Sequence, residues 1–328
     1  MPRCGARFGR KSSPVAFLTN RMSGLLDRTL VIFVRQGRLR AGWRFALLVV
    51  LYWGCGPVLD PILTKLHFPN RGMTAGVLSM NEALDFALIV FFSWIVARLG
   101  RERIASYGLA FRPGWLQLLL KGMVWGAVPS ILIVIPICLA EACSLNGLAL
   151  HGTEMVRSAV LWALAFLLVG FAEEFTFRGC AQWTLGHGIG FWPAAVVLSC
   201  SFGLVHLLFK ENEGWVDPIS VALYGLFWCF TLRRTGSLWF AVGFHAASDY
   251  VDMVVFAEPN TGNGGIPVPG HLLNVVFHGP VWLTGGPRGT EASLLVFPVL
   301  AGLFLLFHLL YPGRAAIERR EPRRLQVV

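Results

Sequence analysis

Residues 158–180 read SAVLWALAFLLVGFAEEFTFRGC, an apolar run that carries Glu173, Glu174 and Arg178 near its end. About 20 mainly apolar residues are enough for a helix to cross the hydrocarbon core of a bilayer. Each ionisable group in such a helix costs roughly 2.5–3.5 kcal/mol to insert, so groups that occur there usually have partners or a function. We therefore predict that this stretch is one helix of a membrane bundle and that its charged residues face other helices.

The composition extends this prediction to the whole chain. Of 328 residues, 55% are hydrophobic and 14% are charged, whereas an average soluble domain has about 25% charged residues. The length leaves no room for a second large domain. We predict an all-α, polytopic transmembrane helix bundle of about eight spans, at 43–63, 82–99, 115–140, 158–180, 190–209, 218–233, 237–256 and 292–311.

Basic residues indicate the orientation of the bundle. The net charge of +10 comes mostly from arginine, much of it at the two ends of the chain. Loops on the cytoplasmic side of membrane proteins carry an excess of Lys and Arg. With eight spans, both termini and both Arg-rich internal loops fall on the cytoplasmic side. The loops predicted outside are poor in basic residues: 64–81, 141–157, 210–217 and 257–291.

The chain then divides into a basic cytoplasmic arm (1–42), a transmembrane domain (43–311) and a basic cytoplasmic tail (312–328). The basic ends are interpreted as membrane anchors, and no nucleic-acid partner is predicted. Within the arm, residues 24–36 are compatible with a helix on the membrane surface and equally with a disordered segment. The Arg- and Gly-rich composition, with no eukaryotic retention signal, suggests a bacterial source and hence the bacterial cytoplasmic (inner) membrane.

Two further features lie outside the charged motifs. Loop 257–291 is rich in Gly and Pro, and loops of this length are often functional or disordered. The seven cysteines lie mostly in apolar runs and form no CxxC pair. We interpret them as small buried apolar residues and not as disulfide partners or metal ligands.

The first polar motif separates two neighbouring carboxylates. On a helix, Glu174 and Arg178 are four residues apart and share a face, so they can neutralise each other in lipid. Glu173 points about 100° away and needs a partner from another helix. One carboxylate is therefore predicted to be structural, and the other is predicted to take a proton from water. The alternative is a helix end at the membrane surface with solvated charges.

Two more apolar runs carry imidazoles. Phe202 and His206 are four residues apart in one run, and His245 and Asp249 are four apart in another. Asp249 can orient the imidazole of His245 or neutralise its charged form. A lone histidine in a membrane helix is often only a packing or hydrogen-bonding residue. The other histidines lie in loops or near the ends of spans and are interpreted as solvated or interfacial.

Together the three motifs predict a hydrolytic site. A carboxylate can activate water, one imidazole can share that water, and further donors can stabilise an oxyanion. The same residues, Glu173, His206 and His245, are also a candidate ligand set for Zn²⁺ with an open position for water. Spacing does not decide between these alternatives, because the chain contains no HExxH motif.

At this point the pattern resembles the type II CAAX prenyl protease family, also called the CPBP or ABI intramembrane proteases. Their motifs are EExxxR, FxxxH and HxxxN on separate helices. Here the first is complete at Glu173–Arg178 and the second at Phe202–His206, whereas the third begins at His245 and has Asp249 where the family has Asn. The motifs lie in order within a core at 158–256, under a third of the chain.

The resemblance implies an all-helical membrane protease with a cavity within the bilayer. By analogy, Glu173 activates the water, His206 shares it, and His245 helps to stabilise the oxyanion with Asp249 in the place of the amide. Glu174 completes the catalytic set in a supporting role, and Arg178 and Phe202 are assigned structural support. An ionised Asp cannot donate a hydrogen bond to an oxyanion. Four alternatives are therefore open for Asp249: it stays protonated, it orients His245, it binds a metal, or its presence means that catalysis is impaired.

The implied activity is that of an intramembrane endopeptidase acting on a membrane protein or a prenylated, CAAX-like or otherwise lipidated peptide, in contact with the lipid bilayer. A non-catalytic membrane immunity or scaffold protein of the same fold is the main alternative. A proton or metal-ion transporter is a third reading, because intramembrane Glu and His also form relays. The absence of an inverted repeat in the sequence argues against it. The oligomeric state stays open.

Overall fold

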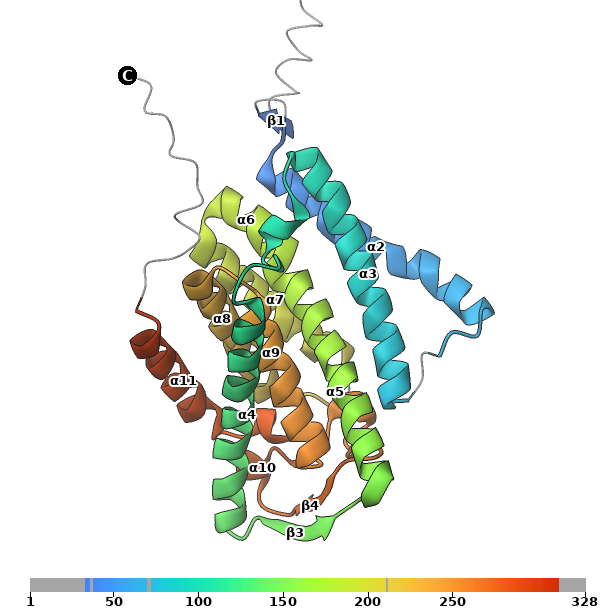
Figure 1. Cartoon of the computed structure of the whole chain (residues 1–328), viewed down its shortest axis with the longest axis vertical. Helices are drawn as coiled ribbons and strands as arrows, with labels where there is room; N and C mark the ends of the chain where they lie inside the picture. Colours follow the sequence, from blue (N-terminus) through green and yellow to red (C-terminus); the bar gives the residue numbers. More distant parts are fainter. Residues whose placement is uncertain (1–32, 36–37, 70–71, 211, 313–328) are drawn as a thin grey trace, which may run out of the picture.

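The computed structural model describes residues 33–35, 38–69, 72–210 and 212–312. The tail from 313 onward and most of the basic arm, with residues 24–32 of the predicted surface segment, lie outside the described residues. The described part is a bundle of helices with two small two-stranded sheets (Figure 1). Its long helices are α2 (Ala41–Lys65), α3 (Ala75–Gly100), α4 (Trp115–Leu139), α5 (Gly152–Glu174), α7 (Phe191–Phe209), α8 (Val216–Thr235), α9 (Trp239–Asp249) and α11 (Val296–Leu310).

The predicted all-α membrane fold is confirmed. A helix occupies each of the eight predicted stretches. In the described part of the chain, five helical segments are long and apolar enough to cross a bilayer: α2, α3, α4, the continuous stretch Gly152–Ile189, and α7. The predicted spans 218–233, 237–256 and 292–311 correspond to α8, α9 with the turn that follows it, and the shorter apolar helix α11.

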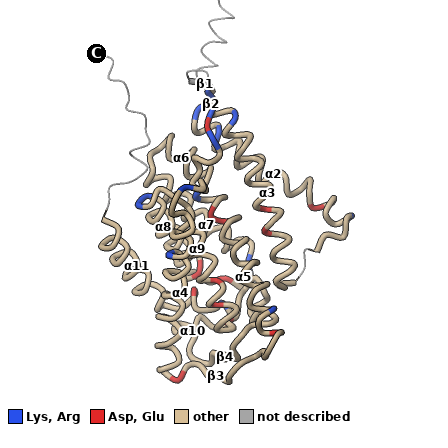
Figure 2. Tube along the Cα trace, viewed as in Figure 1, with Lys and Arg blue, Asp and Glu red and all other residues tan. Residues whose placement is uncertain are grey.

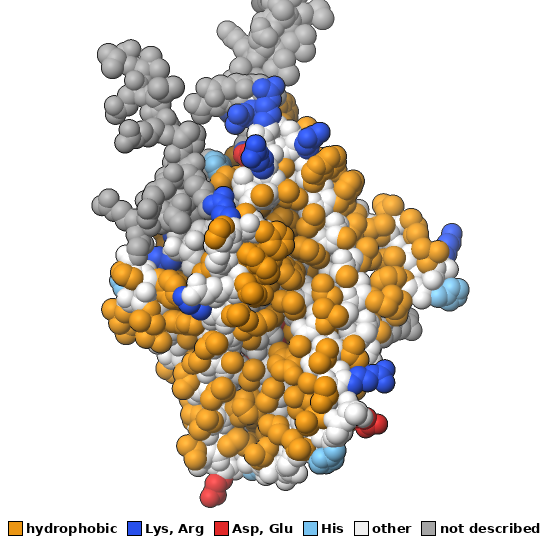
Figure 3. All heavy atoms as spheres, viewed as in Figure 1, with side chains coloured by type: hydrophobic (Ala, Val, Ile, Leu, Met, Phe, Trp, Pro, Cys, Tyr) orange, Lys and Arg blue, Asp and Glu red, His pale blue; other side chains and the backbone are white. Residues whose placement is uncertain are grey.

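The surface of the bundle fits a lipid environment. Large apolar side chains are exposed all along the outer helices, and Figure 3 shows them covering most of the visible face. A soluble monomer rarely exposes contiguous apolar patches larger than a few hundred Å². The protein is therefore an integral membrane protein.

Helix α9 lies at the centre because small residues let its neighbours approach closely. A Cβ atom added to Gly122 or Gly126 of α4 would lie 2.1 Å from a backbone oxygen of α9, and one added to Gly243 of α9 would lie 2.1 Å from the carbonyl of Leu119. Small residues allow this kind of backbone contact between membrane helices. The close packing fixes α9, and with it His245, relative to the rest of the bundle.

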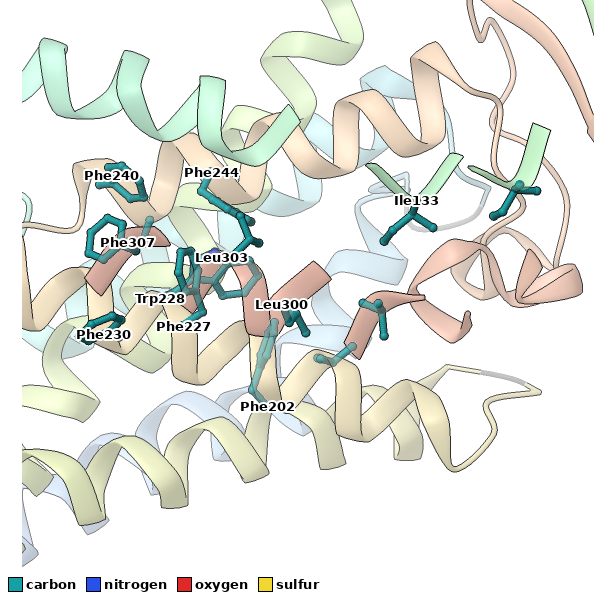
Figure 4. Packing of buried hydrophobic residues seen from close by; sticks show 14 of the residues in the cluster. Ile133, Phe202, Phe227, Trp228, Phe230, Phe240, Phe244, Leu300, Leu303 and Phe307 are labelled. Atoms are coloured by element: carbon teal, nitrogen blue, oxygen red, sulfur yellow. The ribbon is translucent and has the colours of Figure 1, made fainter. Parts of the chain in front are cut away.

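An aromatic core surrounds α9 on its other side. Phe227, Phe240, Phe244 and Phe307 are fully buried and meet in one cluster with Trp228, as Figure 4 shows. Ring pairs in the cluster are tilted or edge-to-face, for example Phe240 and Phe307 at 5.2 Å between centroids. Such pairs contribute about 0.5–1.5 kcal/mol each beyond the area they bury. The core therefore holds α8, α9 and α11 in a fixed arrangement.

One end of the bundle gathers the arginine-rich segments. Arg44 at the start of α2 pairs with Glu102 after α3 at 2.7 Å, and Arg234 at the end of α8 contacts His308 of α11 at 3.0 Å. The loop after α3 joins the turn between α8 and α9 through Leu238 N–H, which donates to the carbonyl of Gly108. Figure 2 shows the concentration of blue residues at this end, which we call the arginine face.

The opposite end is built by the loops that were predicted outside, and we call it the loop face. Strand β3 (Cys143–Leu148) pairs antiparallel with β4 (Leu273–Phe277). Further contacts tie the other loops to this sheet region: Trp162 donates to the carbonyl of Pro269, and Thr261 donates to Glu213. Residues 257–291 are thus ordered, and they form β4 and several short helices at this end of the bundle. The alternative of a disordered loop is wrong.

One prediction about cysteine is wrong. Cys138 and Cys143 form a disulfide across the turn between α4 and β3, on the loop face. The turn at Leu139–Ala142 reverses the chain and brings their Cα atoms to 4.7 Å, a separation that a disulfide needs. Of the other cysteines in the described region, Cys180 and Cys229 are buried as expected, whereas Cys55 is half-buried and Cys200 is exposed.

Candidate active site

The first motif lies on a distorted helix. After Glu174 the regular α5 gives way to a π-helical turn, η2 (Phe175–Cys180), in which Gly179 has the non-helical angles φ −82° and ψ −113°. The chain then continues as α6 (Ala181–Ile189), so the helix end predicted near Gly179 is a kink within a longer helical stretch. A second π-helical turn, η3 (Tyr250–Val255), follows Asp249. Single π-helical turns inside helices occur frequently at functional sites.

A buried ionic cluster occupies the interior side of the site. Arg178 Nη1 donates to Glu174 Oε1 at 3.2 Å, and His245 Nδ1 lies 2.9 Å from the same oxygen. The side chains of Glu174 and Arg178 are fully buried, and that of His245 is 6% exposed. A carboxylate beside a guanidinium accepts hydrogen bonds, so Nδ1 of His245 carries the hydrogen. Glu174 therefore links the first motif to the third and fixes the orientation of the imidazole.

Aromatic rings enclose this ionic cluster. The guanidinium of Arg178 lies 4.4 Å from the ring centroid of Phe202 and 5.0 Å from that of Trp228, within cation–π range. Trp228 also stacks on the imidazole of His245, with centroids 4.4 Å apart and planes at 12°. A Cβ added to Gly225 would lie 2.2 Å from Arg178 Nη2, so only glycine leaves room for the guanidinium there. Phe202 thus contacts the guanidinium of Arg178, and its supporting role stays a prediction.

The other side of His245 faces a second group of carboxylates. Its Nε2 lies 3.7 Å from Glu173 Oε2 and 3.5 Å from Asp249 Oδ2. The side chains of Glu173 and Asp249 are 30% and 25% exposed, in contrast to the closed environment of Glu174. Glu173 Oε2 has no hydrogen-bond partner among the described residues. A carboxylate oxygen in this state is free to accept a proton from a water molecule.

His206 approaches the same space from α7. Its Nδ1 donates to the carbonyl of Phe202 at 2.9 Å, which leaves Nε2 as the nitrogen that can accept or share a hydrogen bond in the neutral ring. The Phe202 ring neighbours both imidazoles, with its centroid 4.6 Å from that of His206 and 6.3 Å from that of His245. The three motifs therefore converge, although they are up to 76 residues apart in the chain.

A cavity of about 350 Å³ connects these residues. This is the size of a small-ligand or peptide-side-chain site. Glu173, His206, His245 and Asp249 all line it, whereas Glu174 and Arg178 do not. Other ionisable or polar residues of the lining belong to no motif and had no signal in the sequence: Asn81, Glu82, Lys210, Tyr224, Asp252, Glu258, Arg288 and Glu291.

The candidate zinc site does not form in this arrangement. Among the described residues, no group of three or more His, Cys, Asp or Glu side chains is placed so that it could hold a metal ion. Glu173 Oε2 and His245 Nε2 lie 3.7 Å apart, close to the separation of two donor atoms that each bind one zinc ion at about 2.0–2.2 Å, so what the described residues lack is a third ligand beside them. The zinc set stays a prediction that metal analysis of purified protein would test.

Comparisons with known proteins agree with the motif pattern. Residues 155–251 match the family model described as Rce1-like, type II CAAX prenyl endopeptidase. The resemblance predicted from the three motifs is thereby confirmed for this segment, which contains all of them. No solved structure matches the chain.

A curated relative comes from Bacillus subtilis (strain 168), where it is described as the uncharacterized protein YyaK. The two sequences are 30% identical over 166 residues, which is 47% of this chain and 52% of the relative. The chain therefore matches about half the length of that relative. The family match implies a protease, and the relative adds no known substrate.

Proposed function

We propose that the protein is an intramembrane endopeptidase that hydrolyses a peptide bond of a membrane-associated polypeptide with a water molecule activated by Glu173. The observation that carries the proposal is the position of Glu173 in the cavity. Its Oε2 has no hydrogen-bond partner among the described residues and lies 3.7 Å from Nε2 of His245, and the same cavity is lined by His206. Hydrolysis of an amide requires a base, a second group that handles protons and an oriented imidazole.

The proposed reaction begins with a water molecule between Glu173 and His206. Glu173 removes one proton from this water as the water oxygen attacks the scissile carbonyl carbon. At the same time, Nε2 of His206 accepts a hydrogen bond from the other O–H group of the water. The carbonyl becomes an oxyanion, which His245 stabilises when Nε2 is protonated. The C–N bond then breaks, and the proton held by Glu173 passes to the leaving amine, so that Glu173 returns to its ionised state.

Glu174, Arg178 and Asp249 act on His245 in this scheme. The pair of Glu174 and Arg178 holds Nδ1 and leaves Nε2 directed to the cavity. Asp249 Oδ2 lies 3.5 Å from Nε2, where it helps to orient the imidazole. In this scheme Asp249 substitutes for the amide of the resembled family by positioning a neighbouring donor, and it does not itself have to donate a hydrogen bond.

A cleavage assay tests the proposal. Purified protein in lipid vesicles is incubated with a library of membrane-anchored peptides, and wild type is compared with Glu173→Ala and His206→Ala. Glu154→Gln is the matched control, because Glu154 is an exposed carboxylate in the first turn of the same helix α5. The proposal predicts cleavage by wild type and by the control and little or none by the two site variants; equal cleavage by all four proteins eliminates it.

The non-catalytic alternative makes a different prediction. An immunity or scaffold protein of this fold would act through its accessible surface, and the Asp249 departure from the family pattern is what favours it. In cells, Glu173→Gln would then leave the phenotype of the protein intact, while substitutions at exposed positions of residues 257–291, such as Ile266→Asp, would abolish it. The protease proposal predicts the reverse pattern.

A further inference from the structure

The cavity has its entrance on one face of the bundle. It is lined by Glu173 and the two imidazoles and also by Gly72 and Met73 before α3, by Asn260 and Gly262, and by residues 288–291. These last segments all belong to the loop face. Gly262 is exposed at the surface, so the lining continues from the site to solvent on that side.

A layer of apolar side chains closes the route to the arginine face. Tyr107, Phe175, Leu232, Leu238 and Trp239 are all at least nine-tenths buried and pack in one cluster between the site and that face. The described residues of the Arg-rich loops, 101–114 and 233–238, are absent from the cavity lining. Among the described residues, the cavity lining therefore does not extend to the arginine face.

Two independent features indicate which face is which. Arginine-rich loops favour the cytoplasmic side, and they gather on the face away from the cavity entrance (Figure 2). Disulfides form and persist in oxidising compartments outside the cytosol, and Cys138–Cys143 lies on the loop face, next to the β3–β4 sheet. The arginine distribution and the disulfide thus both indicate that the cavity entrance lies on the extracytoplasmic side.

We propose that the site is entered from the extracytoplasmic side, and that its substrates are bilayer-anchored polypeptides whose scissile bond lies at that side. The juxtamembrane segment of a translocated chain has this chemistry, whereas a lipid-modified C-terminus facing the cytoplasm would meet the closed end of the bundle. This inference rests on the proposed function for its substrate, but the sidedness of the entrance can be measured without any catalysis.

Cysteine labelling tests the entrance. In a background in which Cys4, Cys55 and Cys200 are replaced, three single cysteines are introduced: Asn81→Cys in the cavity wall, Thr153→Cys on the loop face and Arg112→Cys on the arginine face. Thr153 and Arg112 are exposed, and Asn81 is a half-buried residue of α3 that lines the cavity. Spheroplasts are treated with a membrane-impermeant maleimide before and after permeabilisation, and a thermal melt confirms that each variant is folded.

The expected result is that Thr153→Cys and Asn81→Cys are labelled in intact spheroplasts, whereas Arg112→Cys is labelled only after permeabilisation. Labelling of Asn81→Cys together with Arg112→Cys, and only after permeabilisation, would overturn the inference. So would an Asn81→Cys protein that is protected under both conditions. Because labelling needs no turnover, a protein that passes this test but cleaves no peptide contradicts the proposed function and leaves the sidedness standing.

Discussion

The two sides of the His245 imidazole differ in what surrounds them. On the Nδ1 side, Glu174 and Arg178 are fully buried, paired with each other and enclosed by Phe202 and Trp228. On the Nε2 side, Glu173 and Asp249 are partly exposed to a cavity, and neither pairs with a Lys or Arg among the described residues. Two carboxylates that are adjacent in the sequence thus have different environments: Glu174 is paired and buried, and Glu173 lines the cavity.

The largest effect on stability is expected on the buried side. Arg178→Ala leaves Glu174 as a buried carboxylate without its counter-charge, and breaking a buried ion pair in this way typically costs about 3–5 kcal/mol. We expect a large drop in melting temperature and the loss of cleavage together. Thermal unfolding in detergent measures the first. Arg157→Ala, which removes an arginine near the start of the same helix α5, is the control and should melt as wild type does.

A smaller but more specific effect is expected from the glycine that accommodates Arg178. In Gly225→Ala the new methyl group meets Nη2 of Arg178, and overpacking of this kind costs about 1–3 kcal/mol. The guanidinium must shift away from Glu174, so activity should fall as well. The matched control is Gly302→Ala on α11, where nothing lies within 4 Å of an added Cβ. Equal melting temperatures for both variants would contradict the packing described for Arg178.

Glu258 shows what happens to a buried carboxyl that lacks an arginine. It is 2% exposed, accepts a hydrogen bond from Thr290 N–H at 2.8 Å, and has no ion pair among the described residues. Burial raises the pKa of this loop carboxyl to about 7, from an ordinary value of 4.5. The unfolded chain therefore ionises first as the pH rises, and the protein loses stability between about pH 4.5 and 7.

Glu258→Gln removes this ionisation. Relative to wild type, the variant should gain stability on going from pH 5 to pH 8, because only the wild type loses the stability that the protonated Glu258 contributes. Melting temperatures of both proteins at the two pH values measure the difference. The exposed Glu154→Gln serves as the control, with no such pH-dependent gain expected. A difference in melting temperature between Glu258→Gln and wild type that is the same at pH 5 and pH 8, or that shifts in favour of wild type at pH 8, would contradict the raised pKa of Glu258.

The smallest effect is expected at Asp249. Asp249→Asn restores the amide of the family pattern and keeps the shape of the side chain beside Nε2 of His245. If the carboxylate only orients the imidazole, kcat/KM should change by less than about tenfold, which corresponds to about 1.4 kcal/mol, and the pH dependence of the rate should shift. A loss of a hundredfold or more would instead make Asp249 a direct participant in proton transfer.

The sequence was sufficient for the helices and for the polar residues of the three motifs. Long apolar runs have a strong signal, and ionisable groups within them are conspicuous because they are costly in lipid. The separation of Glu173 from Glu174 also followed from the 100° turn between consecutive helical residues. What the sequence could not supply is the partner of each group: the contact of Glu174 with His245 joins residues 71 positions apart.

Other parts of the site had no sequence signal. Gly225 and Trp228 are ordinary residues of an apolar run, and only the position of the Arg178 guanidinium gives them importance. The π-helical turn after Glu174 arises from backbone geometry around Gly179, which the sequence suggested was a helix end. The Cys138–Cys143 disulfide depends on a turn between a helix and a strand, and the strand itself forms only by pairing with residues more than 120 positions away.

The most direct measurement of the central claim is a parallel assay of Glu173→Gln and Glu174→Gln for cleavage rate and melting temperature. We predict that Glu173→Gln melts within about 2 °C of wild type but cleaves 10²- to 10⁴-fold more slowly, the usual contribution of a general base. Glu174→Gln should melt at a clearly lower temperature, because it removes the charge that neutralises Arg178. A Glu173→Gln protein that retains full activity, or a Glu174→Gln protein as stable as wild type, would contradict the division of roles between the two carboxylates.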